Sequence, residues 1–331
     1  MEAGFFFVDW LGKPIWVWAT FLGIVVSLLA LDLGVLHRES RDIGVRESLA
    51  MSALYIGLGL AFGGWVWWYF GAEPGMNYLT GFALEKALAM DNVFVIAMIF
   101  GFFAVPRRHQ HRVLFWGILG VIVLRALMIG VGAAMVEHFS WILHVFAVFL
   151  IATGVKMLFV SERPTDLAGN PVVAFLRRRF DVTDELHGER FLVRLPHPAT
   201  GRPTWFATPL LLALVLIELA DIVFAVDSVP AIFAITTDPF IVYTSNVFAI
   251  LGLRALYFAL AAMVSRFHLL KYALAAILIF IGSKIFVADL LGLGKIPPAV
   301  SLAVTFGLLT AGVVWSLLRT RPEIERGVVA E

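Results

Sequence analysis

Long apolar blocks recur along the whole chain, separated by short charged stretches. A bilayer core of about 30 Å needs about 20 residues of helix per crossing, and the blocks are long enough to provide this. Hydrophobic residues make up 61% of the 331 positions and charged residues only 15%, whereas soluble domains are about half apolar and about a quarter charged. We therefore expect an all-α polytopic membrane protein whose single transmembrane domain occupies residues 1–331.

Lys and Arg residues set the expected orientation. The connections between spans alternate between two sets, of which one carries 18 basic residues and the other only Lys13 and Lys295. The positive-inside bias therefore places the N-terminus outside and the C-terminus in the cytoplasm. The predicted spans are nine, at residues 16–36, 50–70, 78–103, 113–136, 141–160, 207–236, 243–265, 272–291 and 297–318.

Residues 161–206 form the longest connection, which is cytoplasmic in this orientation. The segments 191–195 and 204–207 flank a Pro- and Gly-containing stretch and are compatible with a short β-hairpin, although a plain surface loop is the leading interpretation of this connection. Residues 177–179 are three consecutive arginines that would attract anionic lipid at the inner leaflet.

Composition excludes several kinds of function. The net charge of +1 gives no indication of a nucleic-acid partner, and the absence of cysteine excludes disulfides and thiolate metal sites. The chain contains no Gly-x-x-x-x-Gly-Lys-Ser/Thr loop, so it does not use ATP directly. Ser228 has no histidine near it in sequence, and we expect neither an enzyme nor a permanently bound cofactor.

The chain contains an internal repeat. When residue 85 is set against residue 221 without gaps, carboxylates and small polar residues coincide, and two more matches of basic residues follow downstream. We expect residues 78–160 (spans three to five) and 207–291 (spans six to eight) to form an inverted-topology pair, an architecture that places its site near mid-membrane. The matched pairs are Glu85 with Asp221, Asp91 with Asp227, Asn92 with Ser228, Arg125 with Arg254, Gly154 with Gly282 and Lys156 with Lys284.

Acidic residues inside the apolar spans indicate a binding site. An ionised acid facing lipid costs at least about 2.5 kcal/mol, so these residues need partners within the bundle. Asp32, near the inner end of span one, is interpreted either as a guard of the cytoplasmic mouth or as an interfacial acid. The candidate metal ligands are Glu85, Asp91, Asn92, Glu218, Asp221, Asp227 and Ser228.

Arg125 and Arg254 are the two mid-span arginines, and we expect both to brace the site. The alternative is that the acids serve only to pair with these bases. Two arginines face five central carboxylates, however, so pairing does not account for all of them. Lys156 and Lys284 lie nearer span ends, where their side chains can reach the interface.

Helical geometry places Asp227 roughly 120° away from the face that Asp221 and Ser228 share. Pro230 cannot donate a hydrogen bond to the carbonyl of Val226, and its ring clashes there. We therefore expect the helix to kink or open beside Asp227. An opened helix is tolerated where it lines a cavity, and its freed carbonyls can bind an ion.

The candidate ligands offer carboxylate, amide and hydroxyl oxygens. Such sites suit Mg²⁺, Ca²⁺ and Mn²⁺ better than Zn²⁺ or Cu²⁺, which prefer imidazole or sulfur. The residues alone thus predict a site for a hard cation, and they leave a monovalent cation or a proton relay open.

Four segments resemble the TerC family of membrane proteins, and its Alx branch in particular: LDLG at 31–34, EKALAMDN at 85–92, ELADIVFAVDSVPAI at 218–232 and YTSNVFAILGLR at 243–254. The resemblance implies a multi-pass protein of the bacterial inner membrane that is linked to manganese homeostasis. We therefore expect a secondary transporter that exports Mn²⁺ as its substrate and uses the proton gradient. The alternative is a non-transporting membrane scaffold or stress-response subunit, in keeping with family names that refer to tellurium resistance and redox modulation.

Overall fold

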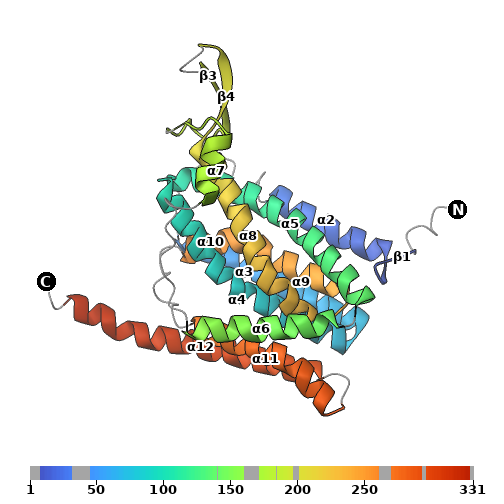
Figure 1. Ribbon diagram of the computed structural model, residues 1–331. Helices are drawn as coiled ribbons and strands as arrows, with labels where there is room; N and C mark the ends of the chain where they lie inside the picture. The colour runs from blue at the N-terminus through green and yellow to red at the C-terminus, as the bar shows by residue number, and fades with distance from the viewer. Residues whose placement is uncertain are drawn as a thin grey trace.

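The computed structural model describes residues 8–31, 45–139, 141–159, 171–183, 185–196, 201–260, 270–292 and 296–328. These residues form a helical bundle with two small β-hairpins (Figure 1). The long helices are α2 (Ile15–Leu31), α3 (Val45–Phe70), α4 (Ala72–Phe102), α5 (Arg107–His138), α6 (Ile142–Phe159), α8 (Pro209–Phe233), α9 (Pro239–Leu251), α11 (Leu270–Leu290) and α12 (Pro298–Val328). The shorter elements are β1 (Asp9–Trp10), β2 (Lys13–Pro14), α7 (Pro171–Arg179), β3 (Leu192–Pro196), β4 (Pro203–Ala207) and α10 (Leu253–Leu260).

Seven helices of the described part are long and apolar enough to cross a membrane, which confirms an all-α polytopic membrane protein. One of the seven consists of α9 and α10, which meet at Gly252. The two other predicted spans also coincide with helices. However, α2 has only 17 residues, and α4 carries Glu85, Lys86 and Asp91 near its middle.

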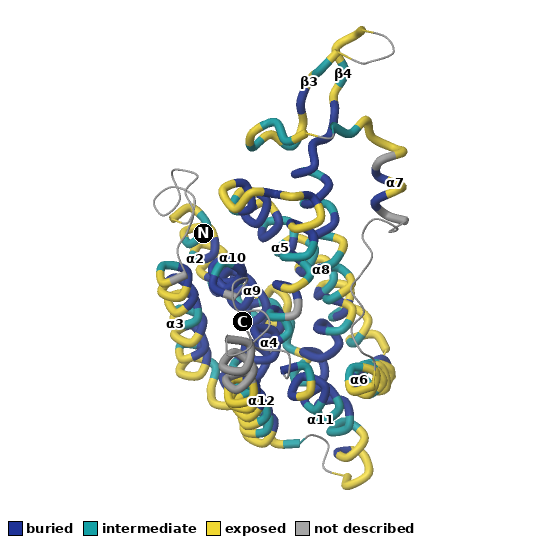
Figure 2. Tube along the Cα trace, turned by 90° about the vertical axis from the view of Figure 1, so that its left-hand side faces the viewer, coloured by how far each residue is buried: buried dark blue, intermediate teal, exposed yellow. Residues whose placement is uncertain are grey.

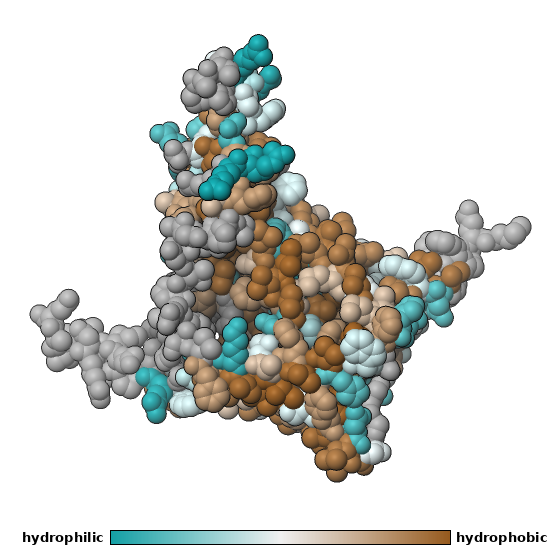
Figure 3. Space-filling model, in the orientation of Figure 1, coloured by the Kyte–Doolittle hydropathy of each residue, from teal (hydrophilic) through white to brown (hydrophobic). Residues whose placement is uncertain are grey.

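The distribution of side chains on α5 shows what surrounds the bundle. Val123, Leu127 and Val131 follow one another at four-residue intervals and are 66%, 65% and 54% exposed, whereas Arg125 is 1% exposed. A helix of a soluble protein has the opposite arrangement, with apolar residues inward and charges outward. The outer surface of the bundle is accordingly apolar over much of the face in Figure 3. Burial concentrates in the centre, where α9 is enclosed along most of its length (Figure 2).

Helices α6 and α11 cross at a close, reciprocal contact. A Cβ atom on Gly154 would lie 2.7 Å from the carbonyl oxygen of Ala275, and a Cβ atom on Gly282 would lie 2.6 Å from that of Ala147. In the register of the sequence repeat, Gly154 corresponds to Gly282 and Ala147 corresponds to Ala275. Each half therefore presents the same patch to the other, as in an interface with two-fold symmetry.

The long connection is not a plain surface loop throughout, because it contains the short hairpin that its sequence allows. Strands β3 and β4 pair antiparallel, with Val193 opposite Phe206, and both of these side chains are buried. The hairpin and α7 extend beyond one end of the bundle (Figure 1).

The predicted opening of the sixth span is not observed. Helix α8 is continuous from Pro209 to Phe233 and contains Pro230 in its last turn. The amide of Ala234 still donates to the carbonyl of Pro230 at 3.0 Å. A proline removes one hydrogen bond from the preceding turn, and here the helix continues through that loss and ends one turn later.

We expect Gly154→Ala and Gly282→Ala to destabilise the protein by similar amounts, about 1–3 kcal/mol each, because both methyl groups would overlap backbone of the facing helix. Thermal unfolding of the detergent-solubilised protein measures the effect. Gly57→Ala in α3 is the control, because a Cβ atom there meets nothing within 4 Å and alanine favours a helix by up to about 1 kcal/mol. Unchanged stability in either crossing variant would contradict the contact.

Candidate functional site

Arg125 on α5 is at the centre of a buried polar network. Its Nε and Nη2 atoms donate to the two carboxylate oxygens of Asp221, each at 3.1 Å, in a bidentate pair. Its Nη1 atom lies 2.8 Å from Oε1 of Glu85. The arginine is 1% exposed, and both acids are also buried. Charge-assisted bidentate pairs of this kind are among the strongest hydrogen bonds in proteins.

Two neutral side chains complete the network. Nη1 of Arg125 also donates to Oγ of Ser228 at 2.5 Å and to Oδ1 of Asn246 at 2.9 Å. These partners and the two acids lie on α4, α8 and α9, so a single guanidinium connects three helices to α5. The network confirms that Arg125 points into the bundle and contacts carboxylates.

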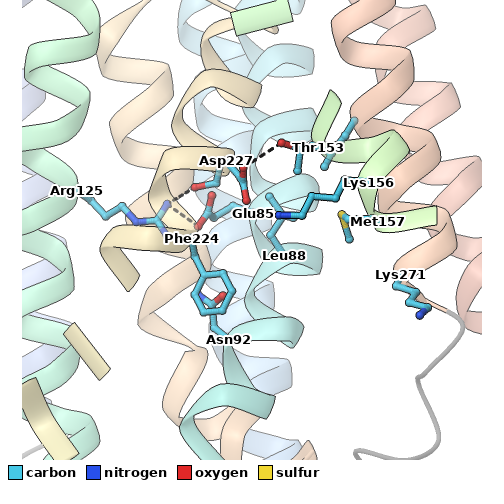
Figure 4. A pocket seen from close by; sticks show the side chains of 12 residues that line it. Glu85, Leu88, Asn92, Arg125, Thr153, Lys156, Met157, Phe224, Asp227 and Lys271 are labelled. Carbon is cyan, nitrogen blue, oxygen red and sulfur yellow. Dashed lines mark hydrogen bonds and ion pairs between the residues drawn. The ribbon is translucent and has the colours of Figure 1, made fainter. Parts of the chain in front are cut away.

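A cavity of about 260 Å³ adjoins the network, between α4, α6, α8 and α11. Asp227 is half-buried in its wall and accepts a hydrogen bond from Oγ1 of Thr153 at 3.3 Å. Oδ1 of Asn92 is buried and has no hydrogen-bond partner among the described residues. Figure 4 shows the side chains converging on this space. The residues that line it are Glu85, Leu88, Asn92, Arg125, Thr153, Lys156, Met157, Phe224, Asp227, Ser228, Lys271 and Leu278.

The structure divides the predicted metal ligands into groups. Glu85, Asn92, Asp227 and Ser228 line the cavity, whereas Asp221 pairs with Arg125 and is not part of the lining. The predicted opening of α8 is not needed to expose Asp227, because the cavity extends to the α6 side of that helix.

Glu218 lies apart from the cavity, against α5. A Cβ atom on Gly120 would overlap its carboxylate, and one on Gly117 would lie 3.9 Å from Oε1. Oε2 is buried without a hydrogen-bond partner in the described part of the chain. Glu218 and Asp227 are nine positions apart in the sequence. At about 100° per residue, this spacing places the two side chains on opposite faces of α8, so it indicates that they do not share one site.

Three predicted site residues remain only partly placed. Asp91 belongs to α4, but its side chain lies outside the described residues, as does Asp32. Arg254 on α10 is 3% exposed. Within the described ranges, no three acidic or histidine side chains are grouped to hold a metal ion, and Arg125 lies between Glu85 and Asp221.

Sequence reasoning missed one contributor. Asn246 binds Arg125, and its signal is the polar run Thr244, Ser245 and Asn246 within an apolar span. Lys156 lies near a span end, where its side chain can either reach the membrane interface or approach the acids, and the structure places it in the lining of the cavity.

A second cavity, of about 200 Å³, lies towards the other ends of the same helices. Lys284 and Ile285 of α11 and Leu143 of α6 are among its lining residues. In the register of the repeat these three correspond to Lys156, Met157 and Lys271, which line the first cavity. The two cavities lie on opposite sides of the α6–α11 crossing, and these three lining positions of each correspond in the repeat.

Comparisons with known proteins agree with the resemblance seen in the motifs. The model of the family described as "Integral membrane protein TerC family" matches residues 70–323. An uncharacterized membrane protein of Myxococcus xanthus is 47% identical over 305 residues, which are 92% of this chain and 93% of the relative. The Escherichia coli protein named "Putative membrane-bound redox modulator Alx" is 45% identical over 307 residues, 90% of this chain and 92% of that protein. No solved structure matches.

We expect Arg125→Gln to destabilise the protein by about 3–5 kcal/mol, because it leaves Glu85 and Asp221 buried without their counter-ion. Adding Glu85→Gln and Asp221→Asn should recover much of this loss by removing the unpaired charges. Thermal unfolding of the purified protein is the measurement. Arg112→Gln is the control, because it breaks a largely exposed 3.2 Å pair with Glu189 that contributes about 0–1 kcal/mol. Equal stability of the two single variants would sink this interpretation of the network.

Proposed function

Because this chain belongs to the TerC family of integral membrane proteins, we propose that it is a secondary transporter that exports a hard divalent cation, with Mn²⁺ as the leading candidate. Export is driven by the proton gradient across a bacterial inner membrane, with the N-terminus outside and the C-terminus in the cytoplasm. The nine predicted spans all cross the membrane in this proposal, including α2 and α4.

The observation that carries the proposal is the pair of cavities on opposite sides of the α6–α11 crossing. An inverted repeat gives a transporter two equivalent half-pathways, one towards each side of the membrane. The first cavity lies at the ends of α6 and α11 that adjoin the predicted cytoplasmic connections, and the second lies at their other ends. Rocking of residues 78–160 against 207–291 about the crossing would open them in turn.

Asp227 is the central ligand in this proposal. Arg125 already neutralises part of the charge on Glu85 and Asp221, whereas Asp227 accepts, from the residues that the structure describes, a long hydrogen bond from neutral Thr153. The unpaired Oδ1 of Asn92 provides a second oxygen, and Glu85 and Ser228 lie in the same lining. Carboxylate, amide and hydroxyl oxygens suit Mn²⁺, Mg²⁺ and Ca²⁺. Asp91, the repeat counterpart of Asp227, remains a proposed ligand.

A non-transporting scaffold is the second candidate, and the Arg125 network favours it. A buried arginine that connects four helices is a sufficient reason for two of the acids to be present. This reading leaves Asp227 and the buried oxygen of Asn92 without a role. Flux through liposomes distinguishes the two functions.

We expect Asp227→Asn to abolish Mn²⁺ flux by the purified protein in liposomes, because it keeps the shape of the side chain and removes a ligand charge. Mn²⁺, Ca²⁺, Mg²⁺ and Zn²⁺ are compared side by side, and apparent Mn²⁺ affinity should rise with pH until the acids are ionised. Glu137→Gln is the control, because that acid is exposed near the end of α5 and lines neither cavity. A wild-type protein that moves no metal would favour the scaffold.

The absence of cysteine permits a direct test of the two cavities. Thr153→Cys lies in the lining of the first cavity and Thr237→Cys in that of the second. We expect a membrane-impermeant maleimide to label the first from the cytoplasmic side only and the second from the outside only. Labelling of both from the same side would exclude two opposed half-pathways.

A further inference from the structure

Lys156 places a positive charge inside the first cavity. It lies in the last turn of α6, and its ammonium group points across the cavity towards the acids on α4 and α8 (Figure 4). Its charge acts on the carboxylate of Asp227. It forms no hydrogen bond or ion pair with the residues that the structure describes, so its flexible side chain is not fixed there.

This placement differs from that of an ordinary lysine near the end of a span. Such a side chain usually extends along the helix so that its charge reaches the water interface. Lys271 of α11 behaves in this way, because it lies at the rim of the same cavity and its ammonium group points away from the acids (Figure 4). Lys156 is directed to the interior instead.

The repeat places a second lysine in the same way. Lys156 and Lys284 each follow the crossing glycine of their helix by two positions. Each lines the cavity on its own side, and Nζ of Lys284 donates to Oγ of Ser301 at 3.2 Å. Lysines at corresponding positions of the repeat therefore line both cavities.

We propose that Lys156 is a tethered cation, which occupies the first cavity when no metal is bound and is displaced by the entering cation. The proposal rests on the transport function proposed above and assigns a mechanism of competition to it. In the absence of metal, the ammonium group takes the place of the bound cation. The acids therefore keep a nearby positive charge while the empty transporter returns to the state that binds metal.

The charges of the first cavity explain why a divalent cation would displace the lysine. With Glu85, Asp221 and Asp227 ionised, Arg125 compensates one of three negative charges. Once Lys156 has moved out, two negative charges remain among these described side chains, and one divalent cation neutralises both. A monovalent cation would only replace the charge of the lysine. Exchange is therefore electrostatically favourable for a divalent cation and neutral for a monovalent one.

Mn²⁺ binding to the purified full-length protein, followed by the loss of the free Mn²⁺ electron paramagnetic resonance signal, tests the proposal. Lys156→Gln removes the competing charge, so the Kd for Mn²⁺ should fall at least about tenfold. Lys156→Arg keeps the charge and should stay within about twofold of wild type. Lys271→Gln is the matched control and should also stay near wild type, because that ammonium group points away from the acids.

The outcomes separate the two proposals. If wild type binds Mn²⁺ and Lys156→Gln binds it equally or more weakly, the tethered-cation role is wrong while the transport proposal stands. If Lys271→Gln tightens Mn²⁺ binding as much as Lys156→Gln, the effect comes from the loss of any positive charge near the cavity. The tethered-cation role of Lys156 is then also overturned. If wild type binds no divalent cation, the proposed function fails and this inference fails with it.

Discussion

The guanidinium group of Arg125 is the interaction on which the centre of this protein depends. Isolated carboxylates in the interior of a membrane protein are costly, and Glu85 and Asp221 are both buried there. Arg125 binds both of them and also reaches Ser228 and Asn246, so one side chain connects α5 to three neighbouring helices. Removing Arg125 would leave both Glu85 and Asp221 buried without a counter-ion. The packing of α4, α8 and α9 around α5 is therefore fixed by electrostatics as well as by shape.

The network also determines which acid can act as a ligand. Because Glu85 and Asp221 are occupied by Arg125, the negative charge that faces the open cavity belongs mainly to Asp227. In the proposed site, binding would thus be carried out by Asp227 and bracing by Glu85 and Asp221. Glu218 belongs to neither group. It lies on the opposite face of α8, in a space that Gly120 of α5 leaves open.

The sequence predicted the features that depend on one helix or on chain-wide pattern. Apolar length predicted nine spans, of which seven are confirmed as long apolar helices, and basic residues predicted an orientation. The flanking segments only allowed the hairpin of β3 and β4. The match of Gly154 with Gly282 in the sequence repeat did not predict their reciprocal contact, which is seen only in the structure. Features that depend on which helices pack against one another were not predictable from the sequence. Helical geometry says which face Asp227 occupies, but it does not say that α6 lies opposite that face. For the same reason the inward direction of Lys156, the separation of Glu218 and the partner of Asn246 became visible only when the helices were packed.

The reciprocal crossing of α6 and α11 has a consequence for energetics. When two equivalent halves exchange conformations, a contact in which each half presents the same atoms to the other is the same before and after the exchange. The free energy of such a contact is the same in both states, so it does not contribute to the free-energy difference between them. In the proposed transport cycle, the crossing could therefore be as tight as Gly154 and Gly282 allow without favouring either state, and the balance between the states would be left to the parts in which the halves differ. Those parts include Asn92 against Ser228, Met157 against Ile285 and Lys271 against Leu143.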